Sequence, residues 1–147
     1  MQVLGVTAER LVLATVLGGL IGLERQFRHK AAGLRTNVLI CFGAAMFTVL
    51  SAQMADKVGG DQTRIAAQII TGIGFIGAGT ILHSQGSIVG LTSAATIFVT
   101  ASVGMAAGAG LYSTAIFATI MILIALVGLG KLEDYFERRH PQKTPLT

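Results

Sequence analysis

The stretch that decides the fold is residues 64–80, RIAAQIITGIGFIGAGT. It is apolar enough for the interior of a lipid bilayer, yet it places Gly72, Gly74, Gly77 and Gly79 within eight residues. In a helix, each glycine costs about 0.8–1 kcal/mol relative to alanine. Glycines in membrane helices usually allow close approach of another backbone or of a bound group. The stretch therefore predicts a membrane helix with a contact surface.

The whole chain has the composition of a membrane protein. Of its 147 residues, 52% are hydrophobic and 12% are charged, whereas soluble domains have about 25% charged residues. Its mean hydropathy is +0.71, so polar groups cannot cover a globular surface. The length suffices for one domain. The single cysteine, Cys41, excludes an internal disulfide and is expected to be a small packing residue.

Five apolar runs extend along the sequence, at residues 11–23, 38–52, 65–82, 88–109 and 111–129. A spanning helix needs about 20 mostly apolar residues. The last three runs reach this length, and the first two do so with their flanking residues. A cleaved signal peptide fits the N-terminus poorly, because Glu9 interrupts the apolar run. We therefore predict an all-α membrane protein with five transmembrane helices.

The positive charges support this count. Four basic residues lie in the loop at residues 24–35 and four lie after residue 129, whereas three lie in the remaining loops and ends. With five spans, the two richer segments share one face of the membrane. The positive-inside rule then places the N-terminus outside and the C-terminus in the cytoplasm of a bacterial inner membrane. Four spans would lose this asymmetry.

The basic segments also define the expected domain boundaries. We expect a transmembrane domain at residues 1–130 and a short cytoplasmic tail at residues 131–147. Residues 131–140 can continue the last helix, which Pro141 and Pro145 would end. A basic tail beside a bilayer contacts anionic lipid, so the net charge of +4 indicates membrane lipids rather than nucleic acid as a partner.

A weak internal repeat relates the two halves of the chain. GLIG at residues 19–22 precedes GLRT at 33–36, and GFIG at 74–77 precedes GLTS at 90–93. In the five-span topology both pairs run in the same direction, which would make a parallel repeat of two-helix hairpins. Such repeats often frame binding sites at their interface. In a chain with 19 glycines, coincidence is the alternative.

Small and hydroxyl-bearing residues recur at helical spacing on three of the predicted helices. These stripes are Ala14, Gly18 and Gly22; Asn37, Cys41, Ala44, Thr48 and Ser51; and Thr92, Thr96, Thr100, Gly104 and Gly108. Small stripes let helix backbones approach, and hydroxyls can donate hydrogen bonds across helices. We expect packing within one protomer, with symmetric dimerisation through one stripe as the alternative. A hydrophilic pore is least favoured, because threonine can bond its own helix backbone.

Ionisable residues lie near the predicted membrane interfaces. Glu24 and Arg25 end the first span, and a hairpin would bring Glu24 close to Arg35 at the start of the second. Either these side chains snorkel as topology anchors, or they form an ion-pair cluster. His29 and His83 are expected in loops, and neither has a second ligand at metal spacing.

Four segments together resemble the MgtC/SapB family of membrane proteins. They are LIGLERQFR at 20–28, AGLRTN at 32–37, RIAAQIITGIGFIGAGTI at 64–81 and GLTSAATIFVTASVGMAAGAG at 90–110. The resemblance covers residues 7–130. It implies a bacterial inner-membrane protein with five transmembrane helices, linked to growth at low magnesium and often to virulence through survival inside host cells.

In that family, the members resemble regulators of membrane physiology more than magnesium channels, and ATP synthase is a proposed partner. Some members carry a long soluble C-terminal domain, which we expect to be lacking here because the chain stops at Thr147. The candidate functional or packing residues in these motifs are Glu24, Arg25, Arg35, Thr36, Asn37, Arg64, Gln68, Gly72, Gly74, Gly77, Gly79, Thr92, Thr96, Thr100, Gly104 and Gly108.

The carboxylates of the chain indicate whether one protomer could bind magnesium. Magnesium takes near-octahedral oxygen ligands, usually with one or two carboxylates. The carboxylates near the spans are Glu9 and Glu24, at helix ends and on opposite faces, so a cage within one protomer is not expected. If the helix is broken at the glycine segment, its backbone carbonyls could serve as ligands for the cation, and an oligomer could bring together carbonyls from several protomers. Transport of magnesium or another cation by a homo-oligomer is therefore the alternative.

No chemistry of another kind is indicated. GIGFIGAG lacks the preceding strand and the soluble context of a dinucleotide loop, so we expect no cofactor and no enzyme activity. We hypothesise that residues 64–80 and the stripe at 92–108 form the central contact surface for partner helices, in a homo-oligomer (a dimer is favoured) or with another membrane protein. On this hypothesis, Gly74→Leu or Gly77→Leu impairs assembly without impairing insertion.

Overall fold

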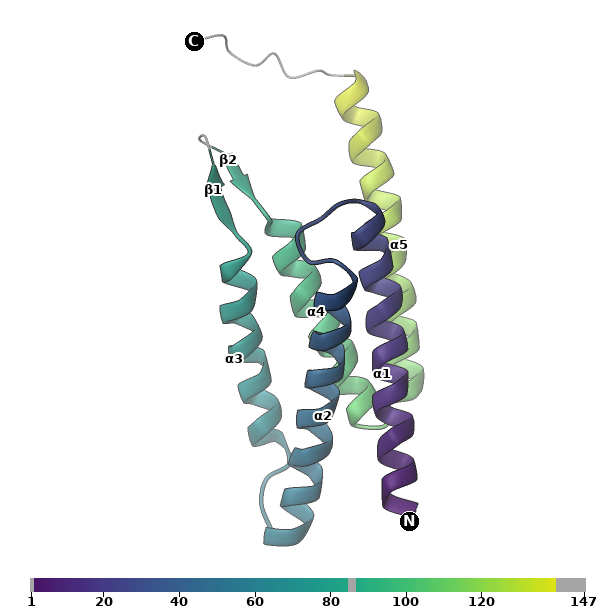
Figure 1. The fold of residues 1–147 in the computed structure, drawn as a ribbon, viewed down its shortest axis with the longest axis vertical. Coiled ribbons are helices and arrows are strands. Elements are labelled where there is room, and N and C mark those ends of the chain that lie inside the picture. Colours follow the sequence, from purple (N-terminus) through teal and green to yellow (C-terminus); the bar gives the residue numbers. More distant parts are fainter. Residues whose placement is uncertain (1, 85–86, 140–147) are drawn as a thin grey trace.

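The computed structural model describes residues 2–84 and 87–139, and in this part of the chain five helices alternate in direction (Figure 1). The elements are α1 (Gln2–Phe27), α2 (Leu34–Val58), α3 (Thr63–Gly79), β1 (Leu82–Ser84), β2 (Ser87–Val89), α4 (Leu91–Gly108) and α5 (Tyr112–Arg139). The predicted all-helical membrane fold is confirmed. The α1–α2 connection, the β1–β2 hairpin and the C-terminal part of α5 lie at one end of the molecule, which we call the basic end (Figure 1).

Four of the described helices are long and apolar enough to cross a membrane. These segments are Gly5–Phe27, Leu34–Val58, Leu91–Gly108 and Tyr112–Leu132. With 17 residues, α3 is about 26 Å long, slightly shorter than a hydrocarbon core of about 30 Å. It lies alongside the other helices and runs opposite to α2 and α4 (Figure 1). Its membrane crossing therefore stays a prediction, supported by its direction.

Two helix boundaries contain a glycine with a left-handed backbone conformation. Gly59, after the last turn of α2, has a φ of 72°, and its N–H donates to the carbonyl of Ala55 over 2.8 Å. Gly90, just before α4, has a φ of 97°, and a Cβ there would collide with the carbonyl oxygen of Thr80. Both positions need the left-handed conformation that glycine adopts without strain.

The centre of the fold is the contact of α1, α2 and α4. A Cβ added to Gly18 of α1 would lie 2.8 Å from the carbonyl oxygen of Asn37 on α2, and one added to Gly108 of α4 would lie 2.9 Å from the Cα of Ala45. A Cβ on Gly104 would collide with the carbonyl oxygen of Cys41, which is fully buried. The expectation that these stripes pack within one protomer is confirmed, and so is the packing role of Cys41.

In contrast, α3 is loosely attached. Its Ile69 and Ile73 pack against Ile97 and Ala101 of α4, and most of its other residues are exposed. The glycine segment is an unbroken helix to Gly79. The carbonyls before its last turn are therefore used in the helix itself, and the broken-helix arrangement that a carbonyl cage would need is not seen in this segment.

The β1–β2 hairpin was not predicted from the sequence. The strands pair antiparallel, with Leu82 opposite Val89 and His83 opposite Ile88, so the expectation that His83 lies in a loop is wrong. The signal was present in two short apolar runs, Ile81-Leu82 and Ile88-Val89, on either side of polar residues. Runs of this length are hard to separate from the ends of apolar helices.

Helix α5 extends beyond the bilayer length. It continues to Arg139, so the expected extension of the last helix is confirmed through that residue, while His140, Pro141 and Pro145 lie outside the described residues. Ala115 and Thr119 face the bundle, whereas Phe117 and Ile124 are exposed. The exposed apolar face of α5 is suited to contact lipid.

Candidate functional site

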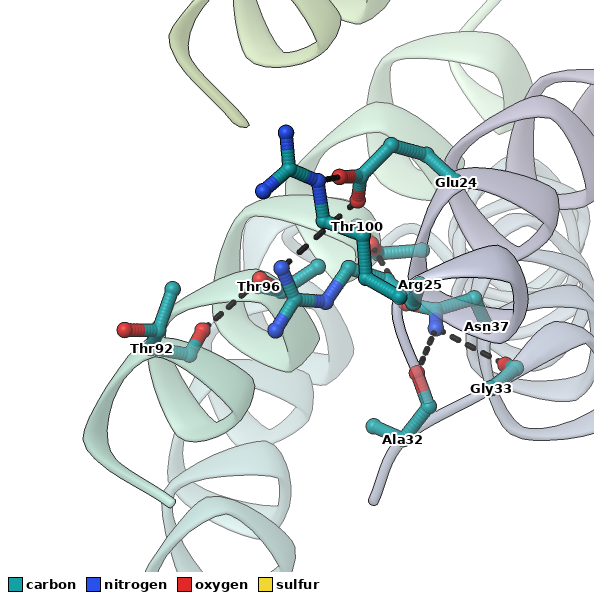
Figure 2. A network of polar contacts seen from close by, with 9 residues as sticks. Glu24, Arg25, Ala32, Gly33, Asn37, Thr92, Thr96 and Thr100 are labelled. Atoms are coloured by element: carbon teal, nitrogen blue, oxygen red, sulfur yellow. Dashed lines mark hydrogen bonds and ion pairs between the residues drawn. The ribbon is translucent and has the colours of Figure 1, made fainter. Parts of the chain in front are cut away.

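A cluster of charged side chains lies where α1 ends at the basic end. Glu24 is flanked by two arginines, with Arg28 Nε 2.9 Å from its Oε1 and Arg25 Nη1 3.6 Å from its Oε2. Figure 2 shows the ion pair between Glu24 and Arg25. The Arg28 pair joins neighbours one helical turn apart, which side chains on one helix reach easily. We call Glu24, Arg25 and Arg28 the charged cluster.

Arg25 is the least exposed ionised residue of this cluster. Its side chain is 2% exposed and extends from α1 toward Thr96 on α4 (Figure 2). Its Nε and Nη2 atoms are buried and have no hydrogen-bond partner in the described part of the protein. Arginine is almost never fully buried unless it is paired. The sequence placed Arg25 at the membrane interface but did not predict this burial.

A second polar group lies beside the charged cluster and joins α2 to α4. The Asn37 side-chain amide donates to the carbonyls of Ala32 (2.7 Å) and Gly33 (2.9 Å). Its Oδ1 accepts a hydrogen bond of 3.0 Å from the hydroxyl of Thr100, and both side chains are fully buried (Figure 2). This group fixes the start of α2 against the middle of α4.

The expected approach of Glu24 to Arg35 is wrong. The ion pairs of Glu24 among the described residues go to Arg25 and Arg28, and Arg35 is exposed. The physical reason is that Arg28 comes directly after α1, one turn beyond Glu24, with its N–H donating to the carbonyl of Glu24. Arg35, in contrast, lies in the first turn of α2 and is exposed. Thr36, its neighbour, is half-buried.

The α4 stripe lies inside the protomer. Thr96, Thr100, Gly104 and Gly108 are buried, and Thr92 in the first turn is exposed. The Thr96 hydroxyl donates to the carbonyl of Thr92 over 2.7 Å. The structure therefore does not join this stripe and the α3 glycines into one surface, because the stripe is used in packing against α2.

The candidate residues of α3 are mostly open. A Cβ added to Gly72, Gly74 or Gly79 would have no atom within 4 Å, whereas one on Gly77 would make ordinary contact with Ala94 of α4 at 3.7 Å. Arg64 and Gln68 are also exposed. The glycines thus lie on the broad outward side of α3, with Gly74 at one edge of it and Gly72 and Gly79 toward the other, and we call this outward side the open α3 face.

A groove runs along one side of the open α3 face, between α2 and α3. Its volume is about 490 Å³. The wall is apolar except for Gln68, and Gly43 of α2 and Gly72 of α3 leave it unobstructed. A polar side chain such as Gln68 on a membrane helix is usually directed to a partner or a water-filled space, which marks this side of α3 as a contact candidate.

Sequence reasoning also missed the role of Arg10. Its Nη1 donates to the carbonyl of Gly108 over 2.9 Å. This bond ties α1 to the last turn of α4, where helix carbonyls lack intrahelical donors. A basic residue near a helix end is too common a signal to have predicted this pairing.

The described residues do not bring together three or more His, Cys, Asp or Glu side chains in a group that could hold a metal ion. Glu24, the carboxylate of the charged cluster, is flanked by two guanidinium groups. The sum of these three charges is +1, so the cluster attracts anions and repels cations.

Comparison with known proteins identifies the family. The sequence model of the MgtC family matches residues 11–135. The chain is 51% identical over 123 residues to "Putative magnesium transporter YhiD" of Escherichia coli (strain K12), which covers 80% of this chain and 57% of that protein. It is 53% identical over 119 residues to "Protein MgtC" of Brucella abortus (strain 2308), with 80% of this chain and 48% of that protein covered.

A third relative extends the match. "Uncharacterized protein slr0014" of Synechocystis is 41% identical over 137 residues, which covers 93% of this chain and 58% of that protein. No solved structure matches the chain. The chain spans about half the length of the curated relatives that it matches. A family match over most of the chain, with relatives above 50% identity, leads to one conclusion: this protein belongs to the MgtC family.

Proposed function

We propose that this protein is a regulator of membrane physiology in adaptation to low magnesium and that it acts by binding partner membrane proteins through α3. The observation that carries the proposal is the open α3 face, where a Cβ added to Gly72, Gly74 or Gly79 would meet no atom of another element within 4 Å. Several glycines on the central helices, such as Gly18 and Gly104, are used in close packing. Glycine in a helix is destabilising unless close approach compensates for it.

The composition of α3 supports a protein partner rather than lipid alone. Lipid chains do not require small residues, whereas helix–helix contacts in membranes are enriched in them. Ala67, Thr71, Gly74 and Ala78 are spaced by three or four residues and all are exposed, so they form one small-residue stripe on the open α3 face. Phe75 is exposed beside this stripe, and its large side chain can pack against small residues of a partner helix.

The partner is either a second copy of this chain, with a dimer favoured, or another membrane protein such as ATP synthase. We propose the same topology that the positive charges of the sequence favour: the basic end lies in the cytoplasm of the inner membrane, and the N-terminus lies outside. Arg28, Lys30, Arg35 and Lys131 lie at the basic end, which is the asymmetry that the rule uses. Because α5 ends at the basic end, a segment that follows α5 would also be cytoplasmic.

Partner recovery from native membranes tests the proposal. The tagged full chain is compared with Gly74→Leu, which fills the open α3 face, and with Gly128→Leu, a matched control because a Cβ on Gly128 of α5 also meets nothing within 4 Å. We expect Gly74→Leu to lose the recovered partner or self-association and to lose growth at low magnesium, with wild-type insertion. Equal recovery and growth in both variants would refute the role of α3.

Cation transport is the second candidate, favoured by the name of the relative "Putative magnesium transporter YhiD". The charge of the cluster argues against it in one protomer, since Glu24 is flanked by Arg25 and Arg28. Liposomes that contain the purified protein alone decide the question. We expect no magnesium flux above that of empty liposomes once insertion is verified, and protein-dependent flux would establish transport.

A further inference from the structure

We propose that the Nε–Nη2 edge of Arg25, beside the first turns of α4, binds a phosphate-type oxyanion at the basic end of the bundle. The site is independent of the open α3 face and of the partner binding proposed above. It would be formed by α1 and α4, with Arg25 as its main donor and with the α4 N-terminus as its second element.

The two unpaired atoms of Arg25 belong to the same edge of the guanidinium. Nη1 faces Glu24 at 3.6 Å, while Nε and Nη2 have no acceptor in the described part of the protein. Nε–H and the nearer Nη2–H point in parallel and can bind two oxygens of one phosphate or carboxylate group at the same time. The edge left unpaired is therefore the one suited to bidentate binding of an oxyanion.

The charges around Arg25 also favour an anion over a water molecule. The side chain is 2% exposed, and Glu24 is shared between Arg25 and Arg28. Glu24 pairs more closely with Arg28, whose side chain is 28% exposed, than with the buried Arg25, so the counter-charge of Arg25 is shared and its buried guanidinium is only partly compensated. A neutral water would satisfy donors but would not compensate this charge. Exposed Arg35 and Lys30 at the same end add to the attraction.

The first turn of α4 supplies further donors. This helix has 18 residues, begins after Gly90 and has no side-chain hydrogen bond at its N-cap. The first N–H groups of a helix have no partner within the helix, and the dipole makes that end attractive to anions. Thr92, in this turn, is the exposed member of the polar group drawn in Figure 2, so an anion can approach from its side.

Binding would require a small movement. Arg25 Nε and Nη2 are buried, so the anion must separate the end of α1 from the first turns of α4 before it can contact them. Occupancy would therefore change the environment of Thr96 and of the amides in the first turns of α4. This coupling gives the proposal a readout apart from affinity.

The test uses the purified full chain in detergent, with ligands that differ in the phosphate alone. Inorganic phosphate is compared with chloride at equal ionic strength, and phosphatidic acid is compared with diacylglycerol of the same acyl chains. The readouts are the Tm and the hydrogen exchange of the first turns of α4. At about 100 times the Kd, a rise in Tm of roughly 5–10 °C is expected with the phosphate-bearing ligand.

Three variants separate the site from general surface charge. Arg25→Lys keeps the charge but has no bidentate edge, so the affinity should fall about tenfold or more. Arg35→Gln removes an exposed cation from the same end and should bind within about twofold of wild type, as expected for a solvent-screened charge. Glu24→Gln removes the competing carboxylate and should bind phosphate roughly tenfold more tightly. A purely structural role for the charged cluster would not produce tighter binding.

A response to inorganic phosphate supports a site for the phosphate group itself, and a response to phosphatidic acid alone supports a lipid headgroup. The proposal is overturned if neither ligand acts, if Arg25→Lys binds like wild type, or if Arg35→Gln loses as much affinity as Arg25→Lys. If Arg25→Lys does not fold, Glu24→Gln decides, because unchanged or weaker binding in that variant contradicts the proposal.

Discussion

The hydroxyl of Thr100 donates a 3.0 Å hydrogen bond to Oδ1 of Asn37, and both side chains are fully buried between α2 and α4. Because Asn37 also donates to the carbonyls of Ala32 and Gly33, one amide side chain connects the basic-end loop, the start of α2 and the middle of α4. In a membrane, such a bond has no water to replace it.

Thr100→Val should therefore destabilise the protein by about 1–2 kcal/mol, since Oδ1 of Asn37 then lacks a donor in a buried place. Unfolding in detergent measures the change. Ser102→Ala is the matched control on the same helix, because Ser102 is exposed and its hydroxyl donates to Val99 of its own helix. A loss of equal size in both variants would show that the interhelical bond contributes nothing of its own.

Two glycine-to-alanine substitutions should change the stability of the protein in opposite directions. In Gly104→Ala the new Cβ collides with the carbonyl oxygen of Cys41, so α2 and α4 must separate at a cost of about 1–3 kcal/mol. In Gly72→Ala the Cβ meets open space, and the better helix propensity of alanine should stabilise the isolated protomer by about 0.8–1 kcal/mol. The Tm of the purified protomer is the measurement, and changes of the same sign in both variants would contradict this packing.

The start of α3 should show a dependence on pH. The Asp61 carboxylate accepts the backbone N–H of Thr63 at 2.8 Å and its hydroxyl at 2.7 Å. The backbone N–H and then the hydroxyl of Thr63 hold the pKa of Asp61 below its ordinary value. A lowered folded-state pKa stabilises the fold above the ordinary value of about 3.9 and ceases to do so as the pH falls through the folded-state pKa.

Amide exchange in the first turn of α3 checks this dependence by comparison of wild type with Asp61→Ala at each pH. The wild type should be better protected at neutral pH, and the difference should shrink below pH of about 4. A difference that stays constant from neutral to acidic pH would contradict the contribution of the ionised carboxylate.

Much of the fold could be predicted because its signals are local. Apolar runs of bilayer length predicted the helices, and the spacing of Gly104 and Gly108 predicted a close-packed stripe because residues four apart share a helix face. The β1–β2 hairpin was missed because its runs are too short to show a period.

The candidate site was less predictable because its geometry depends on distant segments. The burial of Arg25 depends on where α4 lies, more than 60 residues later in the chain, and its sequence neighbours are those of an ordinary interfacial arginine. Glycine spacing likewise indicated contact for both α3 and α4. The tertiary arrangement alone separates Gly104, whose contact lies within the protomer, from Gly74, which is open.

Site-specific photocross-linking in native membranes tests the central claim, that α3 provides the partner surface. A benzophenone amino acid replaces Phe75, which is 84% exposed beside Gly74 on α3, or Phe117, which is 66% exposed on α5. The account predicts a discrete protein adduct from position 75 and lipid adducts alone from position 117. Lipid adducts alone from position 75, or the same protein adduct from both positions, would contradict it.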